Sequence, residues 1–135
     1  MILSVYTDGG SKGNPGPAAI GVVAYADGNE VFRYREDIGK ATNNVAEYRA
    51  VLTAMSKLKT QMSKLNKVTR IDFYSDSRLM VNQLNGHFKV KSSNIQDLIF
   101  KIREQELVLG LPVVFYYIPR EENRVADNLV NSKRF

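Results

Sequence analysis

Polar and apolar residues alternate in the first part of the chain. Residues 2–7, 18–25 and 31–35 show the alternation or the β-branched content of strands, and a turn signal at 27–29 separates the last two. The segment 9–17 is rich in glycine and proline, which is typical of a loop. We therefore expect the chain to open with three consecutive antiparallel strands.

From residue 44 onward the pattern changes to the spacing of helices. The apolar positions between 44 and 58 recur every three or four residues, whereas a continuous apolar and aromatic run at 113–118 predicts a buried strand. The elements expected after the first three strands are helix 44–58, strand 68–74, helices 77–84 and 94–109, strand 113–118 and helix 121–132.

Strands that alternate with helices after an antiparallel meander are typical of an α/β fold. We expect a five-stranded mixed sheet, with three antiparallel and two parallel strands, flanked by helices. Residues 1–135 are expected to form one domain, since the length falls in the usual range for single domains.

Composition restricts the classes of function. Of the 135 residues, 44% are hydrophobic and 24% are charged, as in ordinary globular proteins. The absence of cysteine excludes disulfides, thiolate metal sites and cysteine nucleophiles. The first apolar run is too short for a signal peptide and no run is long enough to span a membrane, so we expect a cytoplasmic protein. The net charge of +5 favours a polyanionic partner.

Two carboxylates directly follow predicted strands. Asp8 ends the first strand, and Asp76 ends the strand at 68–74. Ligands of open α/β sheets bind at the carboxyl ends of strands, although Asp8 also suits a turn before two glycines and Asp76 suits a helix N-cap. Asp72, inside the same strand, is expected on its solvated face.

Glu47 lies inside the apolar arc of the helix predicted at 44–58. A carboxylate is costly to bury there unless a cation or hydrogen bonds meet it, and no Lys or Arg shares the arc, so a bound cation is one solution. Asp127 lies at the margin of the apolar face of the last predicted helix, a position that also suits a solvated flank.

These four carboxylates together predict a chemistry. If the strands that end at Asp8 and Asp76 are parallel neighbours, both side chains lie at one edge of the sheet, and a helix packed on the sheet can bring Glu47 to them. Oxygen ligands suit Mg²⁺ or Mn²⁺, and two such ions about 4 Å apart stabilise the attacking and leaving oxygens of a phosphoryl transfer. A basic surface fits the polyanionic substrate of metal-assisted phosphodiester hydrolysis.

Four segments carry a family resemblance that covers nearly the whole chain. They are YTDGGSKGNPG at 6–16, TNNVAEY at 42–48, YSDS at 74–77 and PREENRVAD at 119–127. In this order and spacing they resemble the motifs of type 1 ribonuclease H, most closely the compact archaeal-like branch without a basic handle.

The resemblance implies a ribonuclease H-like fold and an endonuclease that cuts the RNA strand of RNA·DNA hybrids, leaving 5′-phosphate and 3′-hydroxyl ends. It implies a two-metal-ion mechanism with Mg²⁺ or Mn²⁺ held by the catalytic carboxylates Asp8, Glu47, Asp76 and Asp127. It also implies a set of substrate contacts. These are Gly9, Gly10, Asn14, Asn43 and Asn44 at the hybrid, and Lys40, Thr42 and Asn94 at a phosphate of the DNA strand.

The chain departs from the family pattern in two places. Many members have a histidine in the loop before the last aspartate, whereas Arg120 and Glu121 occupy this region here and are candidates for an auxiliary role. The long basic handle that some members insert after the second helix is also missing. In place of the handle, we expect a group of lysines on and after helix 44–58 to bind the hybrid. These are Lys57, Lys59, Lys64 and Lys67.

Other functions remain open at this stage. A non-catalytic module that binds RNA·DNA hybrids, or a related nuclease that also cuts double-stranded RNA, would share the same motifs. Proofreading-type exonucleases would show Asp-x-Glu at the first strand, and integrases would end their set with Glu where this chain has Asp127. A Walker-type nucleotide site is excluded because its glycine-lysine motif is absent. We expect a monomer.

Overall fold

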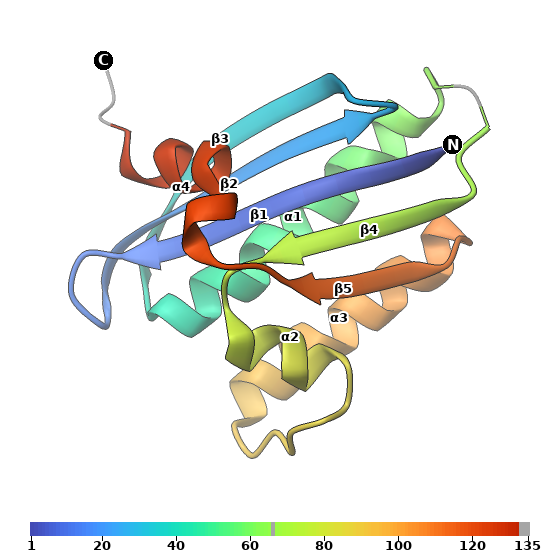
Figure 1. The fold of residues 1–135 in the computed structure, drawn as a ribbon. Helices are drawn as coiled ribbons and strands as arrows, with labels where there is room; N and C mark the ends of the chain where they lie inside the picture. Colours follow the sequence, from blue (N-terminus) through green and yellow to red (C-terminus); the bar gives the residue numbers. More distant parts are fainter. Residues whose placement is uncertain (66, 133–135) are drawn as a thin grey trace.

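Five strands form one mixed sheet in the order β3-β2-β1-β4-β5 in the computed structural model, which describes residues 1–65 and 67–132 (Figure 1). β1 and β4, and β4 and β5, pair in parallel, whereas the first three strands form an antiparallel meander. The predicted α/β fold class is therefore confirmed. The strands are β1 (Ile2–Ser11), β2 (Gly16–Ala26), β3 (Asn29–Ala41), β4 (Arg70–Ser75) and β5 (Val113–Tyr117).

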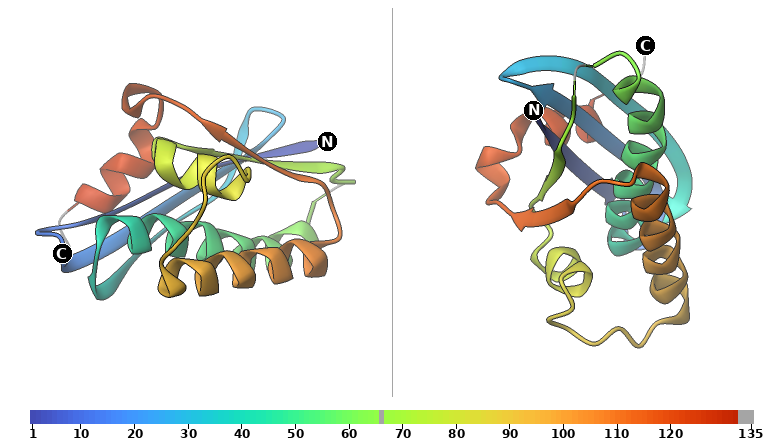
Figure 2. Two further views of the ribbon diagram at one scale, coloured as in Figure 1. Left: turned by 90° about the horizontal axis from the view of Figure 1, so that it is seen from below. Right: turned by 90° about the vertical axis from the view of Figure 1, so that its right-hand side faces the viewer.

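Helices cover both faces of the sheet. The long helices α1 (Asn43–Met62) and α3 (Ser93–Leu109) lie side by side against one face, and α4 (Arg124–Asn131) lies against the other (Figure 2). The short helix α2 (Arg78–Leu84) follows the carboxyl end of β4. None of the helices in the described part of the chain combines the length and the apolar content that a membrane crossing requires.

The main hydrophobic core lies between the sheet and the pair α1 and α3. Alternate residues of β1, Leu3 and Val5, point into it and are fully buried, and Tyr48 and Met55 of α1 meet them from the opposite side. Burial of such apolar side chains contributes roughly 1.5–3 kcal/mol each relative to exposure. The core therefore fixes α1 against β1.

Tyrosines line the face of the sheet away from α1. Tyr6 stacks on Tyr74 with ring centroids 4.8 Å apart, Tyr74 stacks on Tyr116 at 5.3 Å, and Tyr25 meets Tyr6 edge-on at 5.7 Å. Each stacked pair is also a pair in the strand register. Because cross-strand aromatic pairs stabilise a sheet, this row of rings holds β1, β4 and β5 in register.

The helix predicted at 44–58 and the strand predicted at 2–7 are both longer in the structure. Thr42 caps α1, since its Oγ1 accepts a hydrogen bond from the Val45 N–H at 3.1 Å, and the helix continues to Met62. β1 continues through the residues predicted as loop because Asp8 to Ser11 remain paired with β2. Asp8 therefore lies within a strand and not at a turn.

Three other predictions are wrong. β5 lies at the edge of the sheet and is not a buried strand. Its residues Tyr116 and Tyr117 are each 40% exposed. Asp72 is 4% exposed and pairs with Arg70 at 2.8 Å, where a solvated position was expected. The helix expected at 121–132 is divided into a 3-10 turn and α4, with Asn123 between them.

Gly9 allows α1 to touch β1 directly. A Cβ atom at this position would lie 2.6 Å from the backbone nitrogen of Glu47, which is closer than real Cβ atoms approach. At Gly10 the nearest heavy atom would be 3.6 Å away, an ordinary contact. The two adjacent glycines therefore have different roles, and only the first is required by helix packing.

We predict that Gly9→Ala lowers the free energy of unfolding by about 2–3 kcal/mol, because α1 must move away from β1. Gly10→Ala is the matched control and is expected to change it by less than about 0.5 kcal/mol. Urea unfolding of both variants measures the difference. Equal stabilities would contradict this account of the helix–strand contact.

Candidate active site

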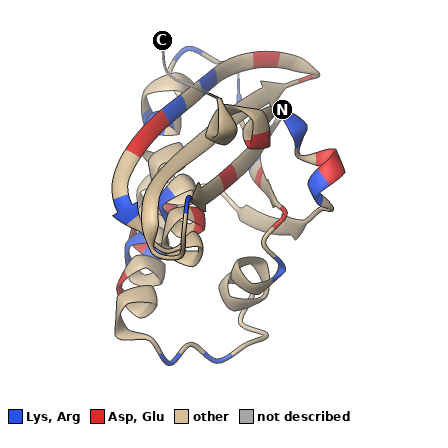
Figure 3. Ribbon diagram, turned by 90° about the vertical axis from the view of Figure 1, so that its left-hand side faces the viewer, with Lys and Arg blue, Asp and Glu red and all other residues tan. Residues whose placement is uncertain are grey.

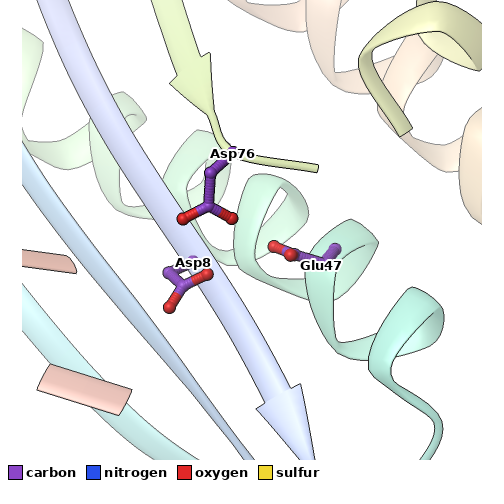
Figure 4. A group of neighbouring side chains, drawn as sticks. All are labelled: Asp8, Glu47 and Asp76. Carbon is purple, nitrogen blue, oxygen red and sulfur yellow. The ribbon is translucent and has the colours of Figure 1, made fainter. Parts of the chain in front are cut away.

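Three carboxylates converge at the carboxyl end of the parallel strands (Figure 4). Asp8 comes from β1, Asp76 from the residue after β4, and Glu47 from the beginning of α1. One oxygen atom from each side chain can be chosen so that all three lie within 4.8 Å of one another. The structure therefore brings together residues that are far apart in the sequence.

The strand register explains why two of these residues meet. Tyr6 of β1 pairs with Tyr74 of β4 in a parallel ladder, and Asp8 and Asp76 each follow two residues later. Two residues along a strand return to the same face, so both carboxylates emerge on one side. The expectation that these two strand ends are neighbours is confirmed. The N-cap of α2 is Ser77, so the alternative role predicted for Asp76 does not apply.

Glu47 is held by the backbone of β1. Its side chain is 9% exposed, and its Oε1 accepts a hydrogen bond from the Gly9 N–H at 3.0 Å. Its neighbours on the same helix face include Ala50, Val51 and Ala54, all fully buried. The predicted position of Glu47 within the apolar arc of α1 is thus correct, and one hydrogen bond compensates only part of its burial.

Asp127 approaches Asp8 from the face of the sheet that α4 covers, opposite α1. It lies in the first turn of α4, and its negative charge is one of the influences that raise the pKa of Asp8. Asn131, one turn later, donates to the Asp127 Oδ1 at 3.1 Å. Asp127 is not one of the three residues whose oxygens lie within 4.8 Å of one another. Its charge acts on Asp8, so it lies beside the cluster and close to that residue.

Two residues of the sheet fix the place of α4. A Cβ atom at Gly21 would lie 2.6 Å from the Ala126 carbonyl oxygen, so only glycine allows this close approach. Arg35 of β3 donates from Nε to the Leu129 carbonyl at 2.7 Å, near the carboxyl end of the helix. These contacts determine where Asp127 is presented. No local pattern in the sequence marks either residue as part of a site.

The pKa values of the clustered carboxyl groups are raised above their usual range. Burial raises the pKa of Asp8 to about 8, and the negative charges of Asp76 and Asp127 add to the effect. Arg120 acts in the opposite direction. Asp8 is 4% exposed, which accounts for burial as the leading cause.

The pKa values of the other two carboxyls are also raised. Burial is the main cause for Glu47, followed by the charges of Asp8 and Asp76, and the Gly9 N–H partly offsets it. For Asp76 burial again comes first, while a hydrogen bond from Asn123 and the charge of Arg120 lower its pKa. Carboxylates that repel one another at short distance favour the binding of a cation between them.

The donor set fits a hard divalent cation. It consists of carboxylate oxygens, the ligands that Mg²⁺ and Mn²⁺ prefer in proteins. The three residues come from separate elements that the core and the strand register hold in place, so the donors are organised before any ligand binds. A divalent ion would offset the mutual repulsion that raises the pKa values of these groups.

A hollow of about 810 Å³ opens beside the cluster. Asp8, Glu47 and Asp127 line it together with basic residues from three different segments, Lys12, Arg35 and Arg120. Charges of both signs lie along β3, which forms one wall of this hollow (Figure 3). A hollow that combines a cation site with basic side chains suits a phosphate-containing ligand.

The predicted hybrid-contacting asparagines organise the loop between β1 and β2. The Oδ1 of Asn43 accepts a hydrogen bond from the Ser11 N–H at 2.9 Å, and the Oδ1 of Asn14 accepts one from the Asn43 N–H at 3.0 Å. Asn44 lies beside them in the first turn of α1. The structure thus places all three of these asparagines around the amino end of α1.

The predicted phosphate-contacting residues lie in separate elements. Lys40 is exposed near the end of β3, and Thr42 forms the N-cap of α1. Asn94 is exposed in the first turn of α3, whose N-cap is Ser92. Glu121 is exposed in the 3-10 turn next to Arg120.

The lysine group expected to replace the basic handle lies at the other end of α1. Lys57 is ten residues after Glu47, which corresponds to about 15 Å along the helix axis. Its Nζ lies 4.1 Å from the centre of the Tyr34 ring, a cation–π contact within the protein. Its role in substrate binding stays a prediction.

Asn123 is the main residue of the site that sequence analysis assigned no role. It is 1% exposed, and its Nδ2 donates to the Thr7 carbonyl at 2.9 Å and to Asp76 at 3.4 Å. The only indication of its role in the sequence is its place in the fourth motif, PREENRVAD at 119–127. An asparagine before a helix is ordinarily interpreted as a cap, so its contact with the cluster becomes visible only in three dimensions.

Comparisons with known proteins agree with this geometry. Residues 6–133 match the family described as reverse transcriptase-like. The bifunctional protein Rv2228c of Mycobacterium tuberculosis is 37% identical over 134 residues, which are 97% of this chain. The chain spans only 35% of the length of that relative.

Two further matches cover both proteins almost completely. Ribonuclease HI of Haemophilus ducreyi is 36% identical over 140 residues, covering 94% of this chain and 86% of that protein. The crystal structure of LC11-RNase H1 in complex with an RNA/DNA hybrid is 40% identical, with a TM-score of 0.88 and coverage of 96% of this chain and 94% of that one. Sequence, fold and the placement of the acidic cluster lead to one conclusion: this chain belongs to the ribonuclease HI family.

Proposed function

We propose that this chain hydrolyses the RNA strand of RNA·DNA hybrids as an endonuclease, leaving 5′-phosphate and 3′-hydroxyl ends. The observation that carries the proposal is the convergence of Asp8, Glu47 and Asp76, with oxygens within 4.8 Å, in a protein whose relatives are ribonucleases HI. The LC11 relative was crystallised with an RNA/DNA hybrid, and this supports the substrate class.

The four carboxylates have distinct parts in this proposal. Asp8, Glu47 and Asp76 would hold two Mg²⁺ or Mn²⁺ ions, with Asp127 on the side of Asp8. Bound divalent ions supply an activated water and neutralise the charge that develops on a phosphate during hydrolysis. The protein contributes a rigid frame, since the Gly9 N–H orients Glu47 and Asn131 orients Asp127.

Substrate recognition is proposed to start at the amino end of α1. The Oδ1 atoms of Asn14 and Asn43 are engaged within the protein, whereas no hydrogen bond among the described residues uses their Nδ2 groups. Together with Asn44, these amides can donate to 2′-hydroxyls, the groups that distinguish RNA from DNA. Gly9 and Gly10 are both proposed to lie against the RNA backbone. Gly9 is also required by the packing of α1, whereas Gly10 has no packing role, so its missing side chain leaves room for the RNA.

The DNA strand is proposed to be gripped at a phosphate by Lys40, Thr42 and Asn94. Lys40 supplies the charge, and the Thr42 hydroxyl and the Asn94 amide are hydrogen-bonding groups. We also propose that the protein acts as a cytoplasmic monomer, for which its lack of cysteine and its net charge of +5 are favourable.

Arg120 is proposed to take the place of the loop histidine found in many relatives. It lines the hollow with Asp8, and its charge lowers the pKa values of Asp8, Glu47 and Asp76. A guanidinium in this position can bind the phosphate next to the bond that is cleaved. Glu121 lies at the next position in the 3-10 turn and is the second candidate for an auxiliary role.

For the proposed function, the first prediction concerns the reaction itself. With labelled RNA in a hybrid, the wild-type protein with Mg²⁺ is expected to cut the RNA strand, and Asp8→Asn or EDTA is expected to lower the rate by at least about 10²-fold. Asp97→Asn, the same charge change on the exposed face of α3, is the control and is expected to leave the rate unchanged.

Three results would contradict the proposal in different ways. Cleavage that survives Asp8→Asn would exclude the metal mechanism. Equal cleavage of duplex DNA would exclude the substrate class. Binding of the hybrid by the wild-type protein without any cleavage would favour the non-catalytic hybrid-binding module.

The second prediction concerns Arg120. Arg120→Ala is expected to lower kcat by about 10–100-fold, because the positive charge beside the phosphate is lost. Arg124→Ala removes an exposed arginine four residues later and serves as the control. If the two variants have the same kcat, Arg120 has no auxiliary role.

The third prediction follows from the raised pKa of Asp8, about 8 in the folded protein against about 3.9 in an unfolded chain. Between these values the folded state binds more protons, so in EDTA the free energy of unfolding decreases as the pH rises from about 4 to 8. Asp8→Asn removes this group and is expected to be more stable than wild type by about 1–2 kcal/mol at pH 8 in EDTA.

Urea unfolding at several pH values measures this effect. Saturating Mg²⁺ is expected to reduce the decrease in the wild-type protein, because the ion stabilises the charged carboxylates of the folded state. Parallel pH profiles for wild type and Asp8→Asn in EDTA would contradict the assigned electrostatics.

A further inference from the structure

We propose that Asn123 is a positioning residue of the metal site, whose side-chain amide fixes Asp76 relative to the end of β1. The inference rests on the metal site of the proposed function. It concerns Asn123, which is 1% exposed and lies between the 3-10 turn and α4, so the role inferred for it is indirect and involves no contact with the substrate.

The contacts of Asn123 connect three segments that carry carboxylates. Its Nδ2 donates to the carbonyl of Thr7, the residue before Asp8, at 2.9 Å. The same nitrogen lies 3.4 Å from the Asp76 Oδ2, a long hydrogen bond. Its own carbonyl accepts the backbone N–H of Asp127 at 3.0 Å. One residue therefore links the elements that present three of the four candidate ligands.

The orientation of this amide does not serve the helix that it precedes. Asparagine is favoured at an N-cap because its Oδ1 accepts a hydrogen bond from the first turn. Asn123 occupies the N-cap of α4 but makes no such bond. Its Oδ1 is buried and has no hydrogen-bond partner among the described residues. Both features are unfavourable for stability, so a capping role does not explain this conformation.

A neutral double donor is the chemistry that this position requires. The amide must face a carbonyl and a carboxylate together, and the two N–H groups of Nδ2 can serve both. A lysine or arginine there would neutralise Asp76 and compete with a cation, whereas an aspartate would repel it. The hydrogen bond from Asn123 orients the Asp76 carboxylate, which would hold a cation together with Asp8 and Glu47.

Partners that orient metal ligands in this way change metal affinity by about 10–100-fold when they are removed. We therefore expect Asn123→Ala to weaken Mg²⁺ binding by about that factor, measured by calorimetric titration of Mg²⁺ into the protein without substrate. Asn123→Leu, which keeps the volume but has no donor, is expected to show the same loss. A role in packing alone would spare the leucine variant, and this second variant also serves if the alanine variant does not fold.

Asn85→Ala is the matched control. Its Nδ2 also donates to a strand carbonyl, that of Phe115 at 3.1 Å, but away from the cluster. This variant is expected to bind Mg²⁺ with wild-type affinity, even where its stability to urea is reduced. The control separates a general loss of stability from a specific loss of metal affinity.

Activity provides a second, independent measurement. Because Asn123 is only 1% exposed, Asn123→Ala and Asn123→Leu are expected to bind the hybrid with wild-type affinity in EDTA. At limiting Mg²⁺ their kcat is expected to fall about 10-fold or more and to recover as Mg²⁺ is raised.

Wild-type Mg²⁺ affinity in both Asn123 variants would overturn the inference. Failure of the wild-type protein itself to bind Mg²⁺ would instead contradict the metal site of the proposed function. The two failures are therefore distinguishable in the same titration.

Discussion

The direct contact between the backbone of α1 and that of β1 is the constraint on which the site depends. At Gly9 there is no room for a side chain, and the N–H of this residue donates to Glu47 at 3.0 Å. This places a carboxylate from the helix next to Asp8, the neighbouring residue of the strand. The parallel register of β1 and β4 then adds Asp76. Without the close approach at Gly9, the cluster would lose its third member.

The site uses both faces of the sheet. Glu47 comes from the helix layer that forms the main core, whereas Asp127 comes from α4 on the opposite face. The position of α4 depends on the absence of a side chain at Gly21 and on the hydrogen bond from Arg35 to the Leu129 carbonyl. Because these contacts are remote in sequence, the geometry of the cluster is a property of the whole fold and of no single motif.

The cluster is unfavourable for the folded protein by itself. Burial and mutual repulsion raise the pKa values of Asp8, Glu47 and Asp76, and Asn123 has a buried oxygen without a partner among the described residues. Functional sites often carry such local costs, which the rest of the structure compensates. Here the apolar core and the stacked tyrosines compensate this loss of stability. The net charge of +5 offsets the repulsion that the acidic cluster would exert on a polyanionic ligand.

The sequence alone determined the element order, the fold class and the residues of the cluster, because periodicity, strand-end carboxylates and Glu47 within an apolar arc are local signals. Only the tertiary structure decided the exposure of individual strands and the partners of individual side chains, because these depend on which groups the fold places beside them. The exposure of β5 depends on its place at the sheet edge, and the pairing of Asp72 depends on Arg70. The role of Asn123 depends on which groups the fold brings to its amide, since the same residue before a helix would otherwise cap it.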